Sequence, residues 1–244
     1  MMAHHCWKRL LAAPLLLLCL ATVARAADID RKDPVAMVQQ ATESLLQLAR
    51  DARSYAPADK PRYYHEVSGV LHPVIDTEYF ARGVMATYAS ARVYKSLGSD
   101  AEREAFKARV SRFADTMERV LIETYADVLL TFEGERIDVV LVPGDDISTG
   151  KARVQQTIYT KEGNAYVVQY SAYRNKGGEW QIYNVVVEGV NMGATYRSQF
   201  ADAVERNGGD VDYVVDNWQS LMGQAARSKS GSKSPQQDSA GQGG

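Results

Sequence analysis

The stretch from residue 166 to residue 200 constrains the fold of this chain more than any other. Two runs rich in β-branched and aromatic residues, 166–174 and 179–187, flank the loop Asn175-Lys176-Gly177-Gly178. A Gly-rich loop between two such runs is typical of an antiparallel β-hairpin. The residues that follow repeat an apolar side chain every four positions and predict a helix with one apolar stripe: Met192, Tyr196, Phe200 and Val204. The hairpin therefore offers a sheet face, and the helix can close over it.

The region before the hairpin predicts two more strands, 136–142 and 152–160, each ended by a turn-forming run. A long amphipathic helix precedes them, from the capping-box pattern Ser99-Asp100-Ala101-Glu102 to Gly134. Caps and first-turn residues predict four further helices, beginning at Pro34, near Arg62, after Asp76 and after Asp210. Helices, then four consecutive antiparallel strands, then helices again indicate an α+β domain.

The amino terminus is typical of a secretory signal peptide rather than of a folded element. Lys8 and Arg9 precede an apolar run over 10–21, and Ala24-Arg25-Ala26 fits a cleavage site. The apolar run is too short for a membrane anchor, and Leu18 is too large for lipidation at Cys19. We therefore expect a signal peptide over 1–26 and one domain over 27–222. The segment 223–244 is rich in Ser, Gly, Gln and Lys and predicts a disordered tail.

Charge and cysteine content exclude several classes of function. The signal segment holds three basic residues, so the mature chain keeps 25 of the 28 basic residues against 30 acidic ones. That balance is not typical of a nucleic-acid binder or of a protein permanently held on an anionic membrane surface. Cys6 and Cys19 both lie in the signal segment, which leaves no disulfide and no thiolate metal site in the mature chain. No later apolar run approaches the length of a membrane span, so the sequence predicts a soluble protein.

The sequence offers no catalytic or metal-binding pattern. The mature chain has two histidines, His65 and His72, and lacks the Gly-x-Ser-x-Gly pattern of serine hydrolases. Asp145-Asp146 lacks the spacing of a calcium loop and predicts a turn. Gly177-Gly178 joins two strands instead of opening a helix, which argues against a phosphate-binding loop. We therefore expect neither a metal nor a cofactor.

Three carboxylates beside apolar positions keep an enzyme open as the alternative: Asp127, Asp138 and Glu188. A curved sheet with helices across its mouth can host proton-transfer chemistry on a small apolar substrate. The simpler role of Glu188 is to order the turn that it forms with Gly189. A third alternative is a plain interaction module that feeds a membrane complex.

Several runs resemble one known family. They are Gly178-Glu179-Trp180, the segment 183–190, and Tyr196-Arg197-Ser198-Gln199-Phe200. In these runs the chain is similar to the MlaC-type, or toluene-tolerance auxiliary, family of periplasmic phospholipid-binding proteins. The likeness continues through 125–127, 132–134 and 208–209, and so covers nearly all of the mature chain. It departs at Ala86-Thr87-Tyr88-Ala89, where the family often has Gly-Lys-Tyr-Trp.

The resemblance implies a curved four-stranded antiparallel sheet wrapped by helices, an NTF2-like cone with an apolar lipid cavity. It implies a soluble, non-enzymatic, monomeric periplasmic carrier whose only ligand is phospholipid. The implied partners are an outer-membrane lipoprotein–porin complex and an inner-membrane ABC transporter with a ring-forming substrate-binding subunit. Carrying lipid between them maintains outer-membrane lipid asymmetry. Exposing two chains of about sixteen carbons to water costs on the order of 20–25 kcal/mol, at ~0.8 kcal/mol per methylene, so such lipid needs a carrier.

Strand alternation and helix stripes give the candidate lipid-binding residues. On the fourth strand Tyr183, Val185 and Val187 oppose Ile182 and Val186, and alternation leaves open which set faces inward. The strand candidates are Ile137, Val139, Leu141, Val154, Ile158, Val168, Tyr170, Tyr183, Val185 and Val187. The helix candidates are Phe80, Val84, Met117, Leu121, Tyr125 and Met192.

Overall fold

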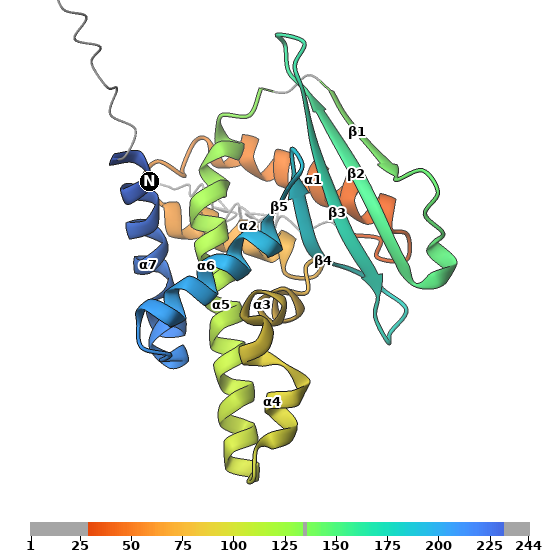
Figure 1. Ribbon diagram of the computed structural model, residues 1–244. Coiled ribbons are helices and arrows are strands. Elements are labelled where there is room, and N and C mark those ends of the chain that lie inside the picture. Colours follow the sequence, from red (N-terminus) through yellow and green to blue (C-terminus); the bar gives the residue numbers. More distant parts are fainter. Residues whose placement is uncertain (1–28, 134–135, 232–244) are drawn as a thin grey trace, which may run out of the picture.

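The computed structural model describes residues 29–133 and 136–231 and has an α+β fold. The predicted signal peptide and residues 232–244 lie outside the described residues. The strands form one antiparallel sheet in chain order, β1-β2-β3-β4-β5 (Figure 1). Their bounds are β1 Arg136–Leu141, β2 Lys151–Tyr159, β3 Ala165–Arg174, β4 Trp180–Val187 and β5 Val190–Asn191.

The four long strands confirm the sequence prediction, and β5 adds a short fifth strand. Glu188 and Gly189 form the turn between β4 and β5, and both have positive φ angles, 47° and 78°. Two central residues with positive φ are typical of a tight hairpin turn. Since β5 has two residues, it carries no alternation from which a strand could be predicted.

The helices at Pro34, after Asp76, after Ser99 and after Asp210 begin where the sequence predicts, because caps and first-turn residues are local signals, whereas the separate short helix Ala91–Ser96 has no counterpart in the prediction. Asp33, Asp76 and Asp210 each accept a hydrogen bond from a backbone N–H in the first turn of the helix that follows. The helices are α1 Pro34–Ala52, α2 Lys60–Leu71, α3 Thr77–Met85, the 3-10 turn η1 Ala86–Ala89, α4 Ala91–Ser96, α5 Asp100–Leu130, α6 Met192–Arg206 and α7 Val211–Gly231.

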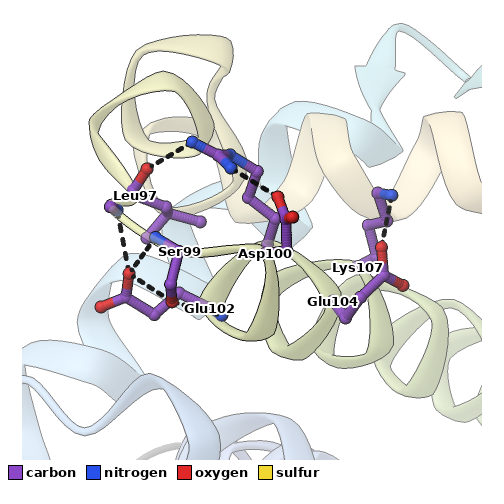
Figure 2. Close-up of polar contacts among 8 residues, drawn as sticks. Leu97, Ser99, Asp100, Glu102, Glu104 and Lys107 are labelled. Atoms are coloured by element: carbon purple, nitrogen blue, oxygen red, sulfur yellow. Dashed lines mark hydrogen bonds and ion pairs between the residues drawn. The ribbon is translucent and has the colours of Figure 1, made fainter.

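The predicted capping box at the start of α5 is confirmed (Figure 2). The backbone N–H of Glu102 donates to Oγ of Ser99 at 3.2 Å. In return, the backbone N–H groups of Ser99 and Gly98 donate to Oε2 of Glu102 at 2.8 and 2.9 Å. These bonds lower the pKa of Glu102 below its ordinary value. Four unpaired N–H groups begin every helix, and this box satisfies part of that need in the longest helix described.

The sheet presents one face to the helices, as Figure 1 shows. Helix α1 packs against this inner face and buries Met37, Val38 and Ala41 with strand residues that include Val154 and Ile182. The described helices gather on this side of the sheet, and α5 runs through the middle of them. A second core lies among α3, α5, α6 and α7, and a third joins α2 to the carboxyl half of α5.

A β-bulge in β4 changes which side chains share the inner face. Ser171 of β3 pairs with Asn184, whereas its neighbour Ala172 pairs with Ile182, so Tyr183 is the extra residue. Beyond such a bulge the alternation of side chains changes phase. Ile182 therefore lies on the same face as Val185, and both pack in the core against α1. The prediction that these two residues oppose one another is wrong.

Helix α7 extends further than the sequence predicts. It runs to Gly231, whereas the tail was expected to begin at Gly223. The segment 224–227 contains Gln, two Ala and Arg, which favour helix, and extending an existing helix is easy compared with starting one. Among the described helices, none combines the length and the apolar character that a membrane span needs.

Candidate functional site

A cavity of about 400 Å³ lies between β4 and the helices. The second and third cores form its helical walls, and the inner face of β4 closes it on the remaining side. Nearly all of its lining is apolar. The lining residues are Val67 and Leu71 of α2, Ile75 between α2 and α3, Thr77 and Phe80 of α3, Met117, Glu118, Leu121, Ile122, Tyr125, Ala126 and Leu129 of α5, Ile182–Val185 and Val187 of β4, and Met192 and Tyr196 of α6.

Helix α5 runs along the whole length of this cavity. Its lining residues fall at steps of four, from Met117 through Leu121 and Tyr125 to Leu129. At 1.5 Å per residue the lined part of the helix is roughly 18 Å long. Half of a bilayer's hydrocarbon core is about 15 Å deep. The cavity is therefore long enough for an extended acyl chain.

The cavity opens to solvent at the carboxyl half of α5 and the end of β4. Tyr125 is 49% exposed and Val187 is 38% exposed, although both line the cavity. Their neighbours Val128, next to Leu129 on α5, and Val190, which pairs with Val187, are exposed apolar residues as well. The deeper lining residues Met117, Ile122 and Ala126 are buried. The opening thus has an apolar rim.

Glu118 is the one carboxylate among the lining residues, and its oxygens are engaged. The Ser68 hydroxyl donates to Oε1 at 2.6 Å, and Nδ1 of His72 lies 3.5 Å from Oε2. A catalytic triad needs the serine hydroxyl on the imidazole, whereas here the hydroxyl of Ser68 is bonded to the carboxylate. This group ties α2 to α5 and does not have the geometry of a nucleophile with its base.

Two tyrosines from different helices meet at the opening. The hydroxyls of Tyr125 on α5 and Tyr196 on α6 lie 3.4 Å apart. The ring of Tyr196 is held edge-on to Phe80 and to Trp218, with both pairs of ring centroids 6.4 Å apart. Burial raises the pKa of Tyr196 well above its ordinary value, followed in size by the hydrogen bond with Tyr125. The phenol of Tyr196 is therefore protonated across the physiological pH range.

A family model described as MlaC protein matches residues 39–220 of this sequence. The match spans well over half of the chain and runs from within α1 through every later element into the first half of α7. The chain belongs to the MlaC family. The resemblance inferred from the hairpin and its following helix is confirmed.

Two curated relatives agree with this assignment. The toluene tolerance protein ttg2D of Pseudomonas putida is 30% identical over 214 residues, 87% of this chain and 91% of the relative. The intermembrane phospholipid transport system binding protein MlaC of Haemophilus influenzae is 27% identical over 175 residues, 70% of this chain and 73% of the relative. Both names describe proteins of lipid transport or solvent tolerance rather than enzymes.

A solved structure has the same fold as this MlaC family member. The phospholipid-binding protein of Ralstonia solanacearum, determined in complex with a phospholipid, matches with a TM-score of 0.62. The match covers 80% of this chain and 99% of the other, at 19% sequence identity. The predicted α+β class is confirmed.

Half of the candidate residues inferred from the sequence line the cavity of this MlaC family member. They come from four elements and converge on one space although they are far apart in the chain: Phe80 of α3, Met117, Leu121 and Tyr125 of α5, Tyr183, Val185 and Val187 of β4, and Met192 of α6. Five of these eight residues come from the helix stripes, since a stripe identifies the buried side of a helix whether it faces a core or a cavity.

The other candidates lie elsewhere. Val84 is buried in the core among α3, α5, α6 and α7. Val139, Leu141, Val154 and Tyr170 pack in the core against α1. The half-buried residues Ile137, Ile158 and Val168 lie on the first three strands and are not among the lining residues, although Val168 pairs with Val187 of β4. These strands share the inner face with β4, but α1 covers that part of the sheet.

Tyr170 shows why some of the strand candidates pack in a core instead of lining the cavity. Its hydroxyl donates to Oε1 of buried Gln156 at 2.6 Å, and Nε2 of Gln156 donates to Thr42 of α1 at 2.9 Å. Desolvation raises the pKa of Tyr170 to about 12. A satisfied buried polar chain of this kind fixes α1 on the sheet. It leaves no space for a ligand at this place.

Sequence reasoning missed part of the lining. Leu129 continues the spacing of Met117, Leu121 and Tyr125, so the same stripe could have identified it. Tyr196 follows Met192 by four residues in the stripe of α6. Val67 and Leu71 of α2 were not among the candidates, although both pack in the third core as well as lining the cavity. Ile182 was not a candidate because the bulge at Tyr183 changes the alternation of side chains along β4.

The carboxylates that kept the enzyme alternative open lie in structural contacts. Asp127 forms an ion pair with Lys60 and accepts the Tyr64 hydroxyl at 3.2 Å. Asp138 pairs with Arg136 at 3.0 Å. Glu188 accepts the backbone N–H of Val167 and thereby orders its own turn. Within residues 29–133 and 136–231, no cluster of three His, Cys, Asp or Glu side chains could hold a metal ion.

Proposed function

We propose that this protein is a soluble phospholipid carrier that holds acyl chains in the cavity between β4 and α5. The observation that carries the proposal is an open, almost entirely apolar cavity about as long as one leaflet of a bilayer. Membership of the MlaC family supports it, as does the phospholipid bound to the Ralstonia solanacearum protein of the same fold.

The energetics favour a carrier of this design. Each methylene that moves from water into the cavity contributes about 0.8 kcal/mol. The lining has no unpaired charge that would oppose this, since Glu118 is bonded to Ser68 and lies close to His72. The apolar rim at Tyr125 and Val187 lets chains enter without crossing a polar barrier.

We assign the acyl-chain contacts to the predicted residues that line the cavity. These are Phe80, Met117, Leu121, Tyr125, Tyr183, Val185, Val187 and Met192. The lining residues that the sequence prediction omitted, such as Leu129 and Ile182, belong to the same set. The candidates packed against α1 have a structural role in this proposal.

The compartment and the partners follow from the family and from the expected signal peptide. We propose that residues 1–26 direct export and that the mature monomer begins at Ala27 in the periplasm. There it would carry lipid between an outer-membrane lipoprotein–porin complex and an inner-membrane ABC transporter with a ring-forming binding subunit, and so maintain lipid asymmetry. Amino-terminal sequencing of protein from the periplasmic fraction tests this, and a retained hydrophobic segment or a lipidated Cys19 would contradict it.

A catalytic function has less support than carriage. The carboxylates near apolar positions are engaged in a turn or in ion pairs, and Ser68 lacks an imidazole partner. The decisive experiment is mass spectrometry of an organic extract of the purified mature protein. We expect stoichiometric intact phospholipid. Protein that carries no phospholipid, or that releases lysolipid and fatty acid from added phospholipid, would refute the carrier.

A further inference from the structure

The hydroxyl pair of Tyr125 and Tyr196 lies at the opening of the cavity and has hydrogen-bonding capacity to spare. A pair of phenols has two O–H donors, and one contact between them uses a single donor. In the described parts of the chain neither hydroxyl makes a second hydrogen bond. The 3.4 Å separation is also longer than an ordinary O–H···O bond. The two groups can therefore reorient toward an acceptor on a ligand.

Two other polar residues of the lining, Asn184 and Glu118, are already committed. Oδ1 of Asn184 accepts from Gly193, and its Nδ2 donates to Asn191. Glu118 accepts from Ser68 and is negatively charged, so it repels an anionic group. Glu118 lies seven residues before Tyr125 on α5, which places it about 10 Å deeper along the helix. A lipid entering the cavity thus meets free donors at the opening and a carboxylate at the far end.

We propose that Tyr125 and Tyr196 bind the phosphate of the carried lipid and thereby fix its orientation, with the chains along α5 and the headgroup outside. This inference rests on the proposed function. A phosphate suits the place better than an ester carbonyl, because Tyr125 is half exposed and a charged group there keeps part of its hydration. Hydrogen bonds to a charged acceptor are also stronger than those to a neutral one.

The ring of Tyr196 is oriented in advance for this role. Phe80 and Trp218 hold the ring from two sides, and Trp218 is fully buried. Tyr125 stands on the opposite wall, on α5, with half of its surface in solvent. One donor is thus rigid and the other adjustable, and together they reach an oxygen placed at the opening. Both are positioning residues for the lipid and take no part in chemistry.

The test compares three ligands with the same cavity. Diphenylhexatriene is a fluorescent hydrocarbon without oxygen, and its binding measures the apolar space alone. Dioleoylphosphatidylglycerol and dioleoylglycerol then compete with it for the delipidated mature protein. The two lipids share their chains and esters, and only the first has a phosphate. The variants are the two single substitutions, Tyr125→Phe and Tyr196→Phe, and the double substitution. Each removes a hydroxyl group and leaves the aromatic ring in place.

We expect the double variant to bind diphenylhexatriene and dioleoylglycerol like the wild type, and to bind dioleoylphosphatidylglycerol about tenfold more weakly. Tyr213→Phe, which removes an exposed phenol on α7, serves as the matched control and should change none of the three affinities. Unchanged phosphatidylglycerol binding, an equal loss for dioleoylglycerol, or an equal loss for all three ligands would each overturn the inference. Wild-type protein that binds diphenylhexatriene but no phosphatidylglycerol would instead refute the proposed function.

Discussion

Oδ1 of Asn184 accepts the backbone N–H of Gly193 at 3.1 Å and so joins β4 to the first turn of α6. The same amide donates from Nδ2 to Oδ1 of Asn191, which caps α6 by accepting the N–H of Ala194 at 3.0 Å. A Cβ atom at position 193 would lie 2.5 Å from Oδ1 of Asn184. The absence of a side chain at Gly193 therefore lets α6 begin directly against the strand, and places Met192 and Tyr196 on the cavity wall.

Gly193→Ala should destabilise the protein, because the added methyl group must displace Asn184 and break its bond to the helix. Losing a partly buried hydrogen bond of this kind costs about 1–3 kcal/mol. Urea unfolding followed by circular dichroism measures the change. Gly69→Ala is the matched control: Gly69 is exposed in α2 and a Cβ there meets nothing within 4 Å. That variant should gain about 0.5–1 kcal/mol, and a similar gain at position 193 would contradict the steric argument.

Ala86 ends α3 with φ 48° and ψ −112°, a conformation that favours glycine. Strain of this kind lowers the free energy of unfolding by about 1–3 kcal/mol. A new glycine lowers it by about 0.4–1 kcal/mol, because glycine increases the conformational entropy of the unfolded chain. Ala86→Gly should therefore raise the free energy of unfolding by about 1 kcal/mol. Ala108→Gly, at an exposed position inside α5, should instead lower stability by about 1 kcal/mol. A loss at both positions would exclude strain at Ala86.

Local sequence signals predicted most of the helices and strands, but they could not predict how distant segments pack against each other. Pro34 in a first turn, the cap at Ser99 and the Gly-rich loop from Asn175 act within a few residues, so most of the helices and the four long strands could be predicted. The break at Ala86 could not, because an alanine gives no sign of a positive φ. Nor could the bulge at Tyr183, which depends on how β4 pairs with β3.

The lining of the cavity shows most clearly what strand alternation cannot predict. Tyr170 of β3 pairs with Val154 of β2 on one side and with Val185 of β4 on the other. The two valines therefore lie on the same face of the sheet. Val154 is completely buried in the core against α1, whereas Val185 is only partly buried beside that core and also lines the cavity. Alternation identifies their common face. Which helix covers each part of that face is decided by contacts between distant segments, and no pattern within one strand records it.

These two valines give a matched test of cavity against core. Val185→Trp should fold with stability near that of the wild type and lose copurifying phospholipid, because the larger ring occupies ligand space. Val154→Trp makes the same change in a filled core, where overpacking typically costs about 1–3 kcal/mol. Thermal unfolding and lipid extraction of both variants provide the comparison. Equal destabilisation of the two would show that the space beside Val185 is not available to a ligand.

The contact between α5 and α7 should depend on pH in a defined direction. Nε and an NH2 group of Arg109 donate to the two carboxylate oxygens of Asp212 at 2.8 and 2.6 Å, and Arg112 adds a bond at 3.1 Å. The bonds from Arg109 are the largest cause that lowers the pKa of Asp212 below its ordinary value. A lowered pKa in the folded state means that the contact stabilises the fold above the unfolded pKa of about 3.9, and that this contribution is lost as the pH falls through the folded value.

Asp212→Asn should therefore lower the free energy of unfolding at pH 7, and the difference from the wild type should shrink toward zero below about pH 3. Both partners are partly exposed, so we expect a difference of about 1 kcal/mol or less. Asp216→Asn removes one longer contact, 3.3 Å from Nε of Arg112, and should have a smaller effect. Urea unfolding of the wild type and both variants at several values between about pH 2.5 and pH 7 measures these differences in the free energy of unfolding. This range includes the pH values at which aspartates titrate. A difference for Asp212→Asn that stays constant across that range would mean that packing, and not its charge, joins α7 to α5.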